Sequence, residues 1–182
     1  LVDRLAPEAA GSGVPDVKAT LANVPVNLSW RVAIVKLLSA TLALGSGLTL
    51  GREAPTIHIG AALAAGLSRL VPTSPDYRRQ MIAAGAGAGL AAAFNAPITG
   101  VLFVVEELLQ DLSSLTLGVA IIASFIGAVI SRLLGGRSLE LNLELEAYQT
   151  SFWITEIPFY LLLGILAGLL GSLFNRGIIA SL

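Results

Sequence analysis

The sequence contains no cysteine and a single histidine, His58. The lack of cysteine excludes disulfides and thiolate metal sites, and a lone histidine excludes a metal site built from several histidines within this chain. Charged residues are also scarce, since they make up 13% of the chain, whereas soluble globular domains carry about 25%. The formal net charge of -1 gives no indication of a nucleic-acid partner. No metal or other cofactor is implied.

Apolar residues are abundant instead. Hydrophobic residues make up 55% of the 182 residues, and the mean hydropathy is +0.82. This balance predicts a membrane protein. The helical segments described next make all-α and polytopic the expected fold class. The chain starts without methionine or a cleavable signal and ends inside an apolar segment, so we expect it to be a portion of a longer polypeptide.

Proline, glycine and charged residues divide the apolar sequence into short segments. We predict a short helix from Pro15 to about Leu21. Apolar helices are expected over 30–50, 54–68, 112–131 and 157–175. Two further helices within 80–105 should meet at a break at FNAP (94–97). The 15 uncharged residues 54–68 give a helix of about 22 Å, shorter than a hydrocarbon core of about 30 Å. Such a helix can begin near the middle of the membrane.

Other residues in these segments carry expectations of their own. Lys36 lies inside an apolar helix, so it should face protein or water rather than lipid. Gly85 and Gly89 are spaced as GxxxG, which lets a helix pack closely on a neighbour. Arg78 and Arg79 mark a candidate cytoplasmic turn, which places the polar loop 132–156 outside.

Three segments share one design, in which a glycine-rich or polar turn is followed by proline and an apolar helix. They are GSGVP (11–15), GREAP (51–55) and FNAP (94–97). Proline near the first position begins a helix whose first amides have no partner inside it. When a helix starts within a membrane, these amides and the positive end of its dipole point into the site at its start. Such a site favours the binding of an anion.

The segments GSGVP (11–15), GREAPT (51–56) and GAGLAAAFNAPITGVLFVVEEL (87–108) resemble the signature segments of the chloride channel and transporter (CLC) family, in the family's order and at similar spacing. The resemblance covers essentially the whole chain, from the end of the family's third helix to its tenth. It implies a CLC-type fold, half of an inverted repeat with broken, partly spanning helices. Residues 1–182 would form a single partial transmembrane domain that lacks the family's second half.

The resemblance also implies roles for residues of the first segment. Ser12 matches the serine whose hydroxyl coordinates the central anion, helped by the neighbouring backbone at Gly11, Gly13 and Val14. A serine here favours chloride over nitrate, because nitrate-preferring relatives tend to carry proline at this position. The other interpretation of Ser12 is an ordinary helix cap.

In the second segment, Glu53 matches the gating glutamate and follows Gly51 and Arg52 directly. A carboxylate at a helix start is itself an anion in an anion site, so Glu53 and chloride would compete for the same amides until protonation removes the competitor. The other interpretation of Glu53 is a structural ion pair with Arg52. Ala54 departs from the family's usual glycine.

In the third segment, Glu107 matches the inner proton-transfer glutamate of the exchangers. Glu106 precedes it, and adjacent helical residues point about 100° apart, so both cannot face one cavity. The choice of Glu107 comes from the resemblance alone. His58 stands where the family often has glutamine, and we weigh a proton relay against plain packing.

Together these features predict proton-coupled chloride exchange by a protein that is not an enzyme. The alternative within the class is a passive voltage-gated chloride channel. An intramembrane hydrolase using Ser12 or the carboxylates lacks a base, because His58 lies in the middle of a helix, and a purely structural scaffold would leave three helix starts without a purpose. The expected partners are chloride, protons and the lipid bilayer of a cell membrane, which the chain crosses several times. The resemblance also implies a homodimer, whose subunits would pack through residues near 98–109 and 115–134.

Overall fold

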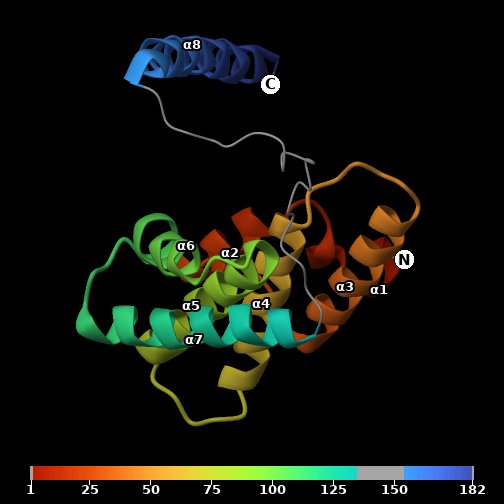
Figure 1. Ribbon diagram of the computed structural model, residues 1–182. Helices are drawn as coiled ribbons and strands as arrows, with labels where there is room; N and C mark the ends of the chain where they lie inside the picture. The colour runs from red at the N-terminus through yellow and green to blue at the C-terminus, as the bar shows by residue number, and fades with distance from the viewer. Residues whose placement is uncertain (1, 135–153, 182) are drawn as a thin grey trace. The chain divides into compact units, whose positions relative to one another are not determined.

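The computed structural model describes residues 2–134 and 154–181, and within these ranges the chain is helical and contains no strand (Figure 1). It divides into two compact units, residues 1–140 and 141–182, which are described separately. The first unit contains α1 (Val2–Leu5), η1 (Pro7–Ala9), α2 (Val14–Leu21), α3 (Trp30–Gly45), α4 (Glu53–Ser68), α5 (Pro75–Phe94), α6 (Pro97–Leu102), the π-helical η2 (Phe103–Leu109) and α7 (Ser114–Leu133). The second contains η4 (Ile154–Glu156) and α8 (Ile157–Ser181).

Helix α5 lies at the centre of the first unit and packs against α4 on one side and α7 on another (Figure 1). Glycine makes this packing possible. A Cβ on Gly60 or Gly89 would overlap backbone atoms of the facing helix, at Gly85 and Thr56 respectively. The close packing predicted from Gly85 and Gly89 is therefore confirmed, and α4 packs closely against α5 between Thr56 and Ala64.

The predicted break at FNAP is confirmed. Helix α5 ends at Phe94, Asn95 adopts the left-handed conformation with φ 54°, and α6 begins at Pro97. Asparagine tolerates positive φ better than most residues, and proline suits the first position of a helix. The apolar sequence contains no signal for the next feature, the π-helical turns over Phe103–Leu109.

Two predicted helices have different bounds from those expected. Helix α3 ends at Gly45 rather than at residue 50, because Ser46 caps it and Gly47 turns the chain with φ 88°. The helices predicted over 54–68 and 112–131 agree within two residues with α4 and α7. Helix α8 runs from Ile157 to Ser181, beyond the predicted end at residue 175. Most of the predicted polar loop 132–156 lies outside the described residues.

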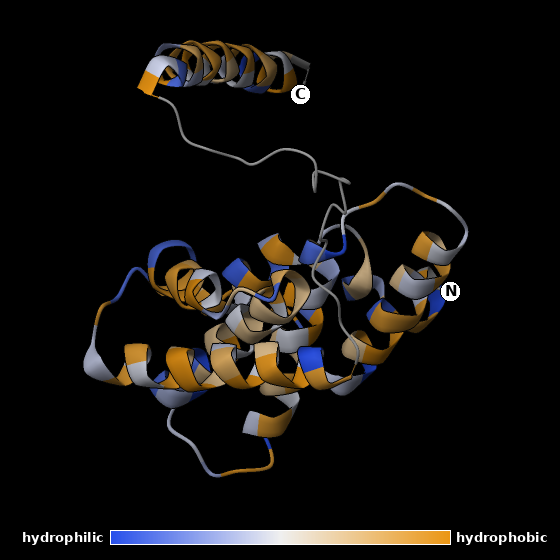
Figure 2. Ribbon diagram, viewed as in Figure 1, coloured by the Kyte–Doolittle hydropathy of each residue, from blue (hydrophilic) through white to orange (hydrophobic). Residues whose placement is uncertain are grey.

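Two segments of the described chain are long and apolar enough to cross a membrane, α7 and residues 154–180. Figure 2 shows the apolar residues along α7 and α8. Large side chains on α7 are exposed, among them Ile122, Phe125 and Ile126. Exposed apolar surface of this extent is typical of helices that face lipid or further protein.

Candidate functional site

The loop formed by residues 11–14, called the 11–14 loop below, turns the chain into the start of α2. Gly11 and Gly13 both have positive φ, 64° and 83°. Only glycine adopts this region without strain, so the GSG spacing has a direct conformational cause. Helix α2 begins at Val14 with Pro15 in its first turn, and the Val17 amide donates to the Gly13 carbonyl.

Ser12 lies beside a hollow of about 330 Å³ at the start of α2. Its lining residues come from the 11–14 loop and its surroundings: Pro7, Glu8, Ala10, Gly11, Ser12, Gly13, Pro15 and Asp16. The N-cap position of α2 is occupied by Gly13 rather than by Ser12, so the simple helix-cap interpretation of Ser12 is wrong. The hydroxyl remains available to a ligand in the hollow.

Lys36 forms a hydrogen bond to the backbone of the 11–14 loop. Its side chain is 5% exposed, and its ammonium donates to the carbonyl oxygens of Ala9 (3.0 Å) and Gly11 (2.6 Å). This confirms that Lys36 faces protein. Because a trans peptide points its C=O and N–H in opposite directions, the Ser12 amide of the Gly11–Ser12 peptide points away from Lys36. Lys36 thus holds the Gly11 carbonyl on the side of the loop opposite the Ser12 amide.

His58 holds the other side of the 11–14 loop. Its imidazole is fully buried and lies against Gly13, where an added Cβ would overlap the ring. Neither ring nitrogen has a hydrogen-bond partner among the described residues. The close fit to Gly13 accounts for the packing role weighed for His58, and it explains why the residue at position 13 must lack a side chain.

Glu53 is the first residue of α4 and is partly buried. It lines a hollow of about 200 Å³ with Leu44, Leu50, Gly51 and Arg52. Its carboxylate lies over Gly51, so a Cβ at position 51 would overlap Oε2. Gly51 therefore provides the space in which the Glu53 side chain rests.

Arg52 does not pair with Glu53. Its guanidinium donates instead to the Ala93 carbonyl of α5 at 2.8 Å, and no ion pair joins the two side chains. The interpretation of Glu53 as a structural ion pair with Arg52 is therefore wrong. Arg52 ties the start of α4 to the last turn of α5, where a cation also meets the negative end of the helix dipole.

The two hollows share no lining residue, but each has a lining residue that belongs to α4 or lies against it: Glu53 in one and Gly13 in the other. Gly13 touches α4 at His58, five residues after Glu53, and five residues correspond to about 7.5 Å along a helix axis. The structure thus places the 11–14 loop close to the first turns of the helix that begins with Glu53.

Glu106 and Glu107 lie on η2, and the structure distinguishes them. The Glu107 carboxylate forms an ion pair with the ammonium of Lys18 on α2. The side chains of Lys18 and Glu107 are 45% and 53% exposed. Glu106 is exposed and has no ion pair within the described residues. Lys18 was missed by the sequence analysis, because nothing local connects it to a residue 89 positions away.

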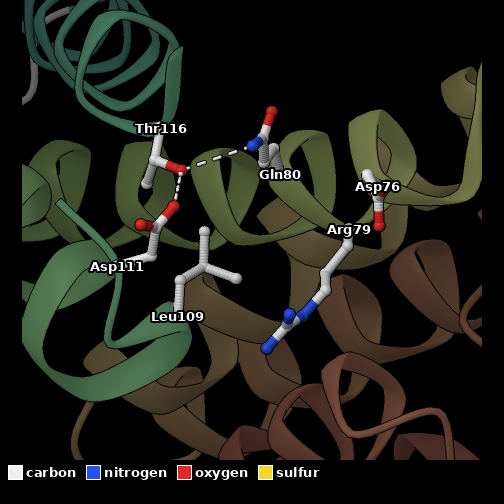
Figure 3. A pocket seen from close by; sticks show the side chains of 6 residues that line it. All are labelled: Asp76, Arg79, Gln80, Leu109, Asp111 and Thr116. Atoms are coloured by element: carbon white, nitrogen blue, oxygen red, sulfur yellow. Dashed lines mark hydrogen bonds between the residues drawn. The ribbon is translucent and has the colours of Figure 1, made fainter. Parts of the chain in front are cut away.

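A third hollow, of about 220 Å³, lies where the starts of α5 and α7 meet the end of η2, and it was not predicted (Figure 3). Asp111 accepts hydrogen bonds from the Ser113 amide (3.0 Å), the Ser113 hydroxyl (2.7 Å) and the Thr116 hydroxyl (2.7 Å), and Gln80 donates to Thr116 (3.4 Å). The hydrogen bonds from Ser113 and Thr116 lower the pKa of Asp111. This network fixes the first turn of α7, and no group of three potential metal ligands occurs in the described part of the chain.

Comparison with known families decides where this arrangement belongs. The family model described as voltage gated chloride channel matches residues 1–182. The chain belongs to this family. The CLC resemblance carried by the three signature segments is thereby confirmed, together with the all-α fold.

Relatives of this CLC chain carry names that describe exchange. The chain is 38% identical over 182 residues to the H(+)/Cl(-) exchange transporter ClcA of Vibrio parahaemolyticus, and the alignment covers 97% of this chain and 38% of the relative. It is 39% identical over 179 residues to ClcA of Vibrio cholerae, covering 96% and 37%. The crystal structure of a slow cyanobacterial Cl-/H+ antiporter aligns with TM-score 0.81 and 33% identity, covering 97% of this chain and 41% of the antiporter. The chain thus spans less than half the length of these relatives.

Proposed function

We propose that this CLC chain forms the first-half portion, a single partial transmembrane domain, of a proton-coupled chloride exchanger. The names of the relatives support exchange, and the observation that carries the proposal is the geometry of the 11–14 loop. Two left-handed glycines present Ser12 to a hollow at a helix start, with the buried Lys36 ammonium behind it. Helix starts favour anions because their first amides lack partners and the dipole is positive there.

Chloride is the proposed ligand of the 11–14 loop. The Ser12 hydroxyl would coordinate it, and the backbone at Gly11, Gly13 and Val14 would contribute amide dipoles. Lys36 favours this arrangement twice, since it adds positive charge and draws two carbonyl oxygens toward itself. Gly11 and Ser12 are exposed at the surface of the described part. The family's second half would cover this surface and complete the coordination.

Glu53 is the proposed gate. Its position at the start of α4 lets its carboxylate occupy an anion site, and the space over Gly51 offers a place to which the side chain withdraws. Protonation neutralises the carboxylate and ends its competition with chloride. In this scheme Arg52 anchors the helix start through Ala93 rather than pairing with the gate.

Glu107 is the proposed inner proton-transfer residue. Of the two adjacent glutamates, it is the one directed toward α2, the helix that carries the 11–14 loop. Glu106 is then an exposed neighbour without a transport role. A proton-coupled exchanger needs a proton path to the inside, and Glu107 is proposed to be part of that path.

The complete protein is proposed to be a multi-pass cell-membrane homodimer in contact with lipid. The apolar outer surface of α7 and the length of α8 support membrane insertion. The predicted subunit interface would use the surfaces of residues near 98–109 and 115–134. Chemical cross-linking of the full-length protein in native membranes measures the subunit number.

A flux assay on the full-length protein in liposomes tests the proposed function. An imposed chloride gradient should drive protons uphill, as read by an internal pH dye and a chloride electrode. Glu107→Gln should abolish proton movement and leave chloride movement, whereas the matched control Glu106→Gln should leave both. If the parent protein moves chloride but never protons, the passive channel replaces the exchanger.

A further inference from the structure

Helix α2 connects the 11–14 loop, the proposed chloride site, with Glu107, the proposed proton-transfer residue. Its first residue, Val14, belongs to the 11–14 loop, and Lys18 follows four residues later. One helical turn is 3.6 residues, or about 5.4 Å. The Lys18 ammonium pairs with the Glu107 carboxylate of η2. One short rigid element therefore holds the anion loop at its start and Glu107 about one turn further along.

The element that carries Glu107 is unusual. Residues Phe103–Leu109 are π-helical, and such turns are rare and often occur at functional sites. A π-helical turn has one more residue than an α-helical turn, which changes the direction in which Glu106 and Glu107 point. Val104 and Leu108 are buried on the same element, so the two glutamates are left at the accessible surface.

We propose that Lys18 is the positioning residue of Glu107 and couples the inner proton site to the 11–14 loop through α2. This inference rests on the proposed exchange function. A carboxylate on its own can adopt several rotamers at a surface that is half exposed. The ion pair selects the rotamer directed at α2, so proton delivery starts from a fixed point relative to the anion loop.

A purely structural role for Lys18 would have a different consequence. Lys18 is the basic residue in the last turn of α2, where a cation stabilises the helix end through the dipole. If stabilising α2 were its only role, its loss would loosen the 11–14 loop and reduce chloride and proton transport together. If it positions Glu107, its loss reduces proton transport selectively.

The ratio of protons to chloride moved by the full-length protein in liposomes separates these roles. Lys18→Gln should lower the proton flux about two- to fivefold, because exposed ion pairs contribute up to about 1 kcal/mol, while the chloride flux stays near that of the parent. Lys18→Arg keeps the charge and should restore the ratio. Arg78→Gln removes an exposed positive charge elsewhere and should leave the ratio unchanged.

The pair itself can be detected without transport. A water-soluble carbodiimide should join the Lys18 amine and the Glu107 carboxylate of the parent protein as an amide with loss of water, found by mass spectrometry of the linked peptides. Glu107→Gln should abolish this product, and Glu106→Gln should not.

Two outcomes would overturn the inference: no cross-link in the parent, or a proton-to-chloride ratio in Lys18→Gln that stays at the parent value, whether both fluxes fall equally or neither falls. A parent that forms the cross-link and carries chloride without protons would instead overturn the exchange function itself. The two failures are therefore distinguishable.

Discussion

Replacing Gly13 with alanine gives a sharp test of how the 11–14 loop is built, because Gly11 offers a matched control. Both glycines have positive φ, 64° at Gly11 and 83° at Gly13. A Cβ at Gly13 would overlap the His58 ring, whereas a Cβ at Gly11 has no neighbouring atom within 4 Å. The two alanine variants therefore share the backbone strain and differ in the steric overlap.

The structure sets the size of each effect. A left-handed non-glycine residue costs about 1–2 kcal/mol, and this is the whole expected cost of Gly11→Ala. Overpacking a buried site adds about 1–3 kcal/mol, so Gly13→Ala should cost about 2–5 kcal/mol in total. That is a large part of a typical stability of about 5–15 kcal/mol.

The assay compares the variants in the full-length protein. Thermal unfolding in detergent measures stability, and calorimetric chloride titration measures the affinity of the loop. Gly13→Ala should lower both the melting temperature and the affinity clearly more than Gly11→Ala does. Adding His58→Ala removes the ring and should recover part of the loss in Gly13→Ala.

Equal losses in Gly11→Ala and Gly13→Ala would show that the contact with His58 is unimportant. A Gly13→Ala protein that His58→Ala fails to rescue would refute the steric explanation in the same way.

The remaining predictions concern the support of the other sites. Lys36→Met leaves the Ala9 and Gly11 carbonyls unpaired, and because hydrogen bonds to charged groups contribute about 1.5–3 kcal/mol to stability, thermal unfolding should show a less stable protein and calorimetry a weaker chloride affinity. Gly51→Ala should displace the Glu53 carboxylate and change chloride flux in liposomes, but it should have no further effect once Glu53→Ala has removed that carboxylate. For Asp111, hydrogen bonding lowers the pKa in the folded state, so its stabilisation is present above the unfolded pKa of about 3.9 and is lost as pH falls through the lower folded value. Thermal unfolding should therefore show Asp111→Asn less stable than the parent at pH 7, with the difference shrinking as the pH falls below about 3.9. If the stability difference between Asp111→Asn and the parent does not change with pH, the hydrogen bonds of Asp111 do not stabilise the protein in solution.

Local sequence rules determined where the helices of this protein begin. Pro15, Pro55 and Pro97 each lie in the first turn of a helix, and the starts of α2, α4 and α6 follow from proline's fixed φ and missing amide. Gly11 and Gly13 likewise reveal the turn before α2. These are properties of one or two residues, so they can be predicted without knowledge of the fold.

Helix ends and helix type were less predictable. The apolar run after Trp30 continues to Leu50, yet α3 stops at Gly45 because the chain turns at Gly47. Hydrophobicity alone does not mark that turn. The π-helical turns of η2 also lack a local signal, since Phe103–Leu109 has the composition of an ordinary apolar helix.

Only the tertiary structure decided which side chains meet. The pairing of Lys18 with Glu107, the contact of His58 with Gly13, and the hydrogen bond from Arg52 to Ala93 all join residues that are far apart in the chain. Such contacts depend on how α2, α4, α5 and η2 pack, and packing is a property of several helices at once. The sequence by itself determined where the helices α2, α4 and α6 start, because backbone geometry is local. Which charges and rings surround those starts depended on long-range packing, for which no residue carries a local signal.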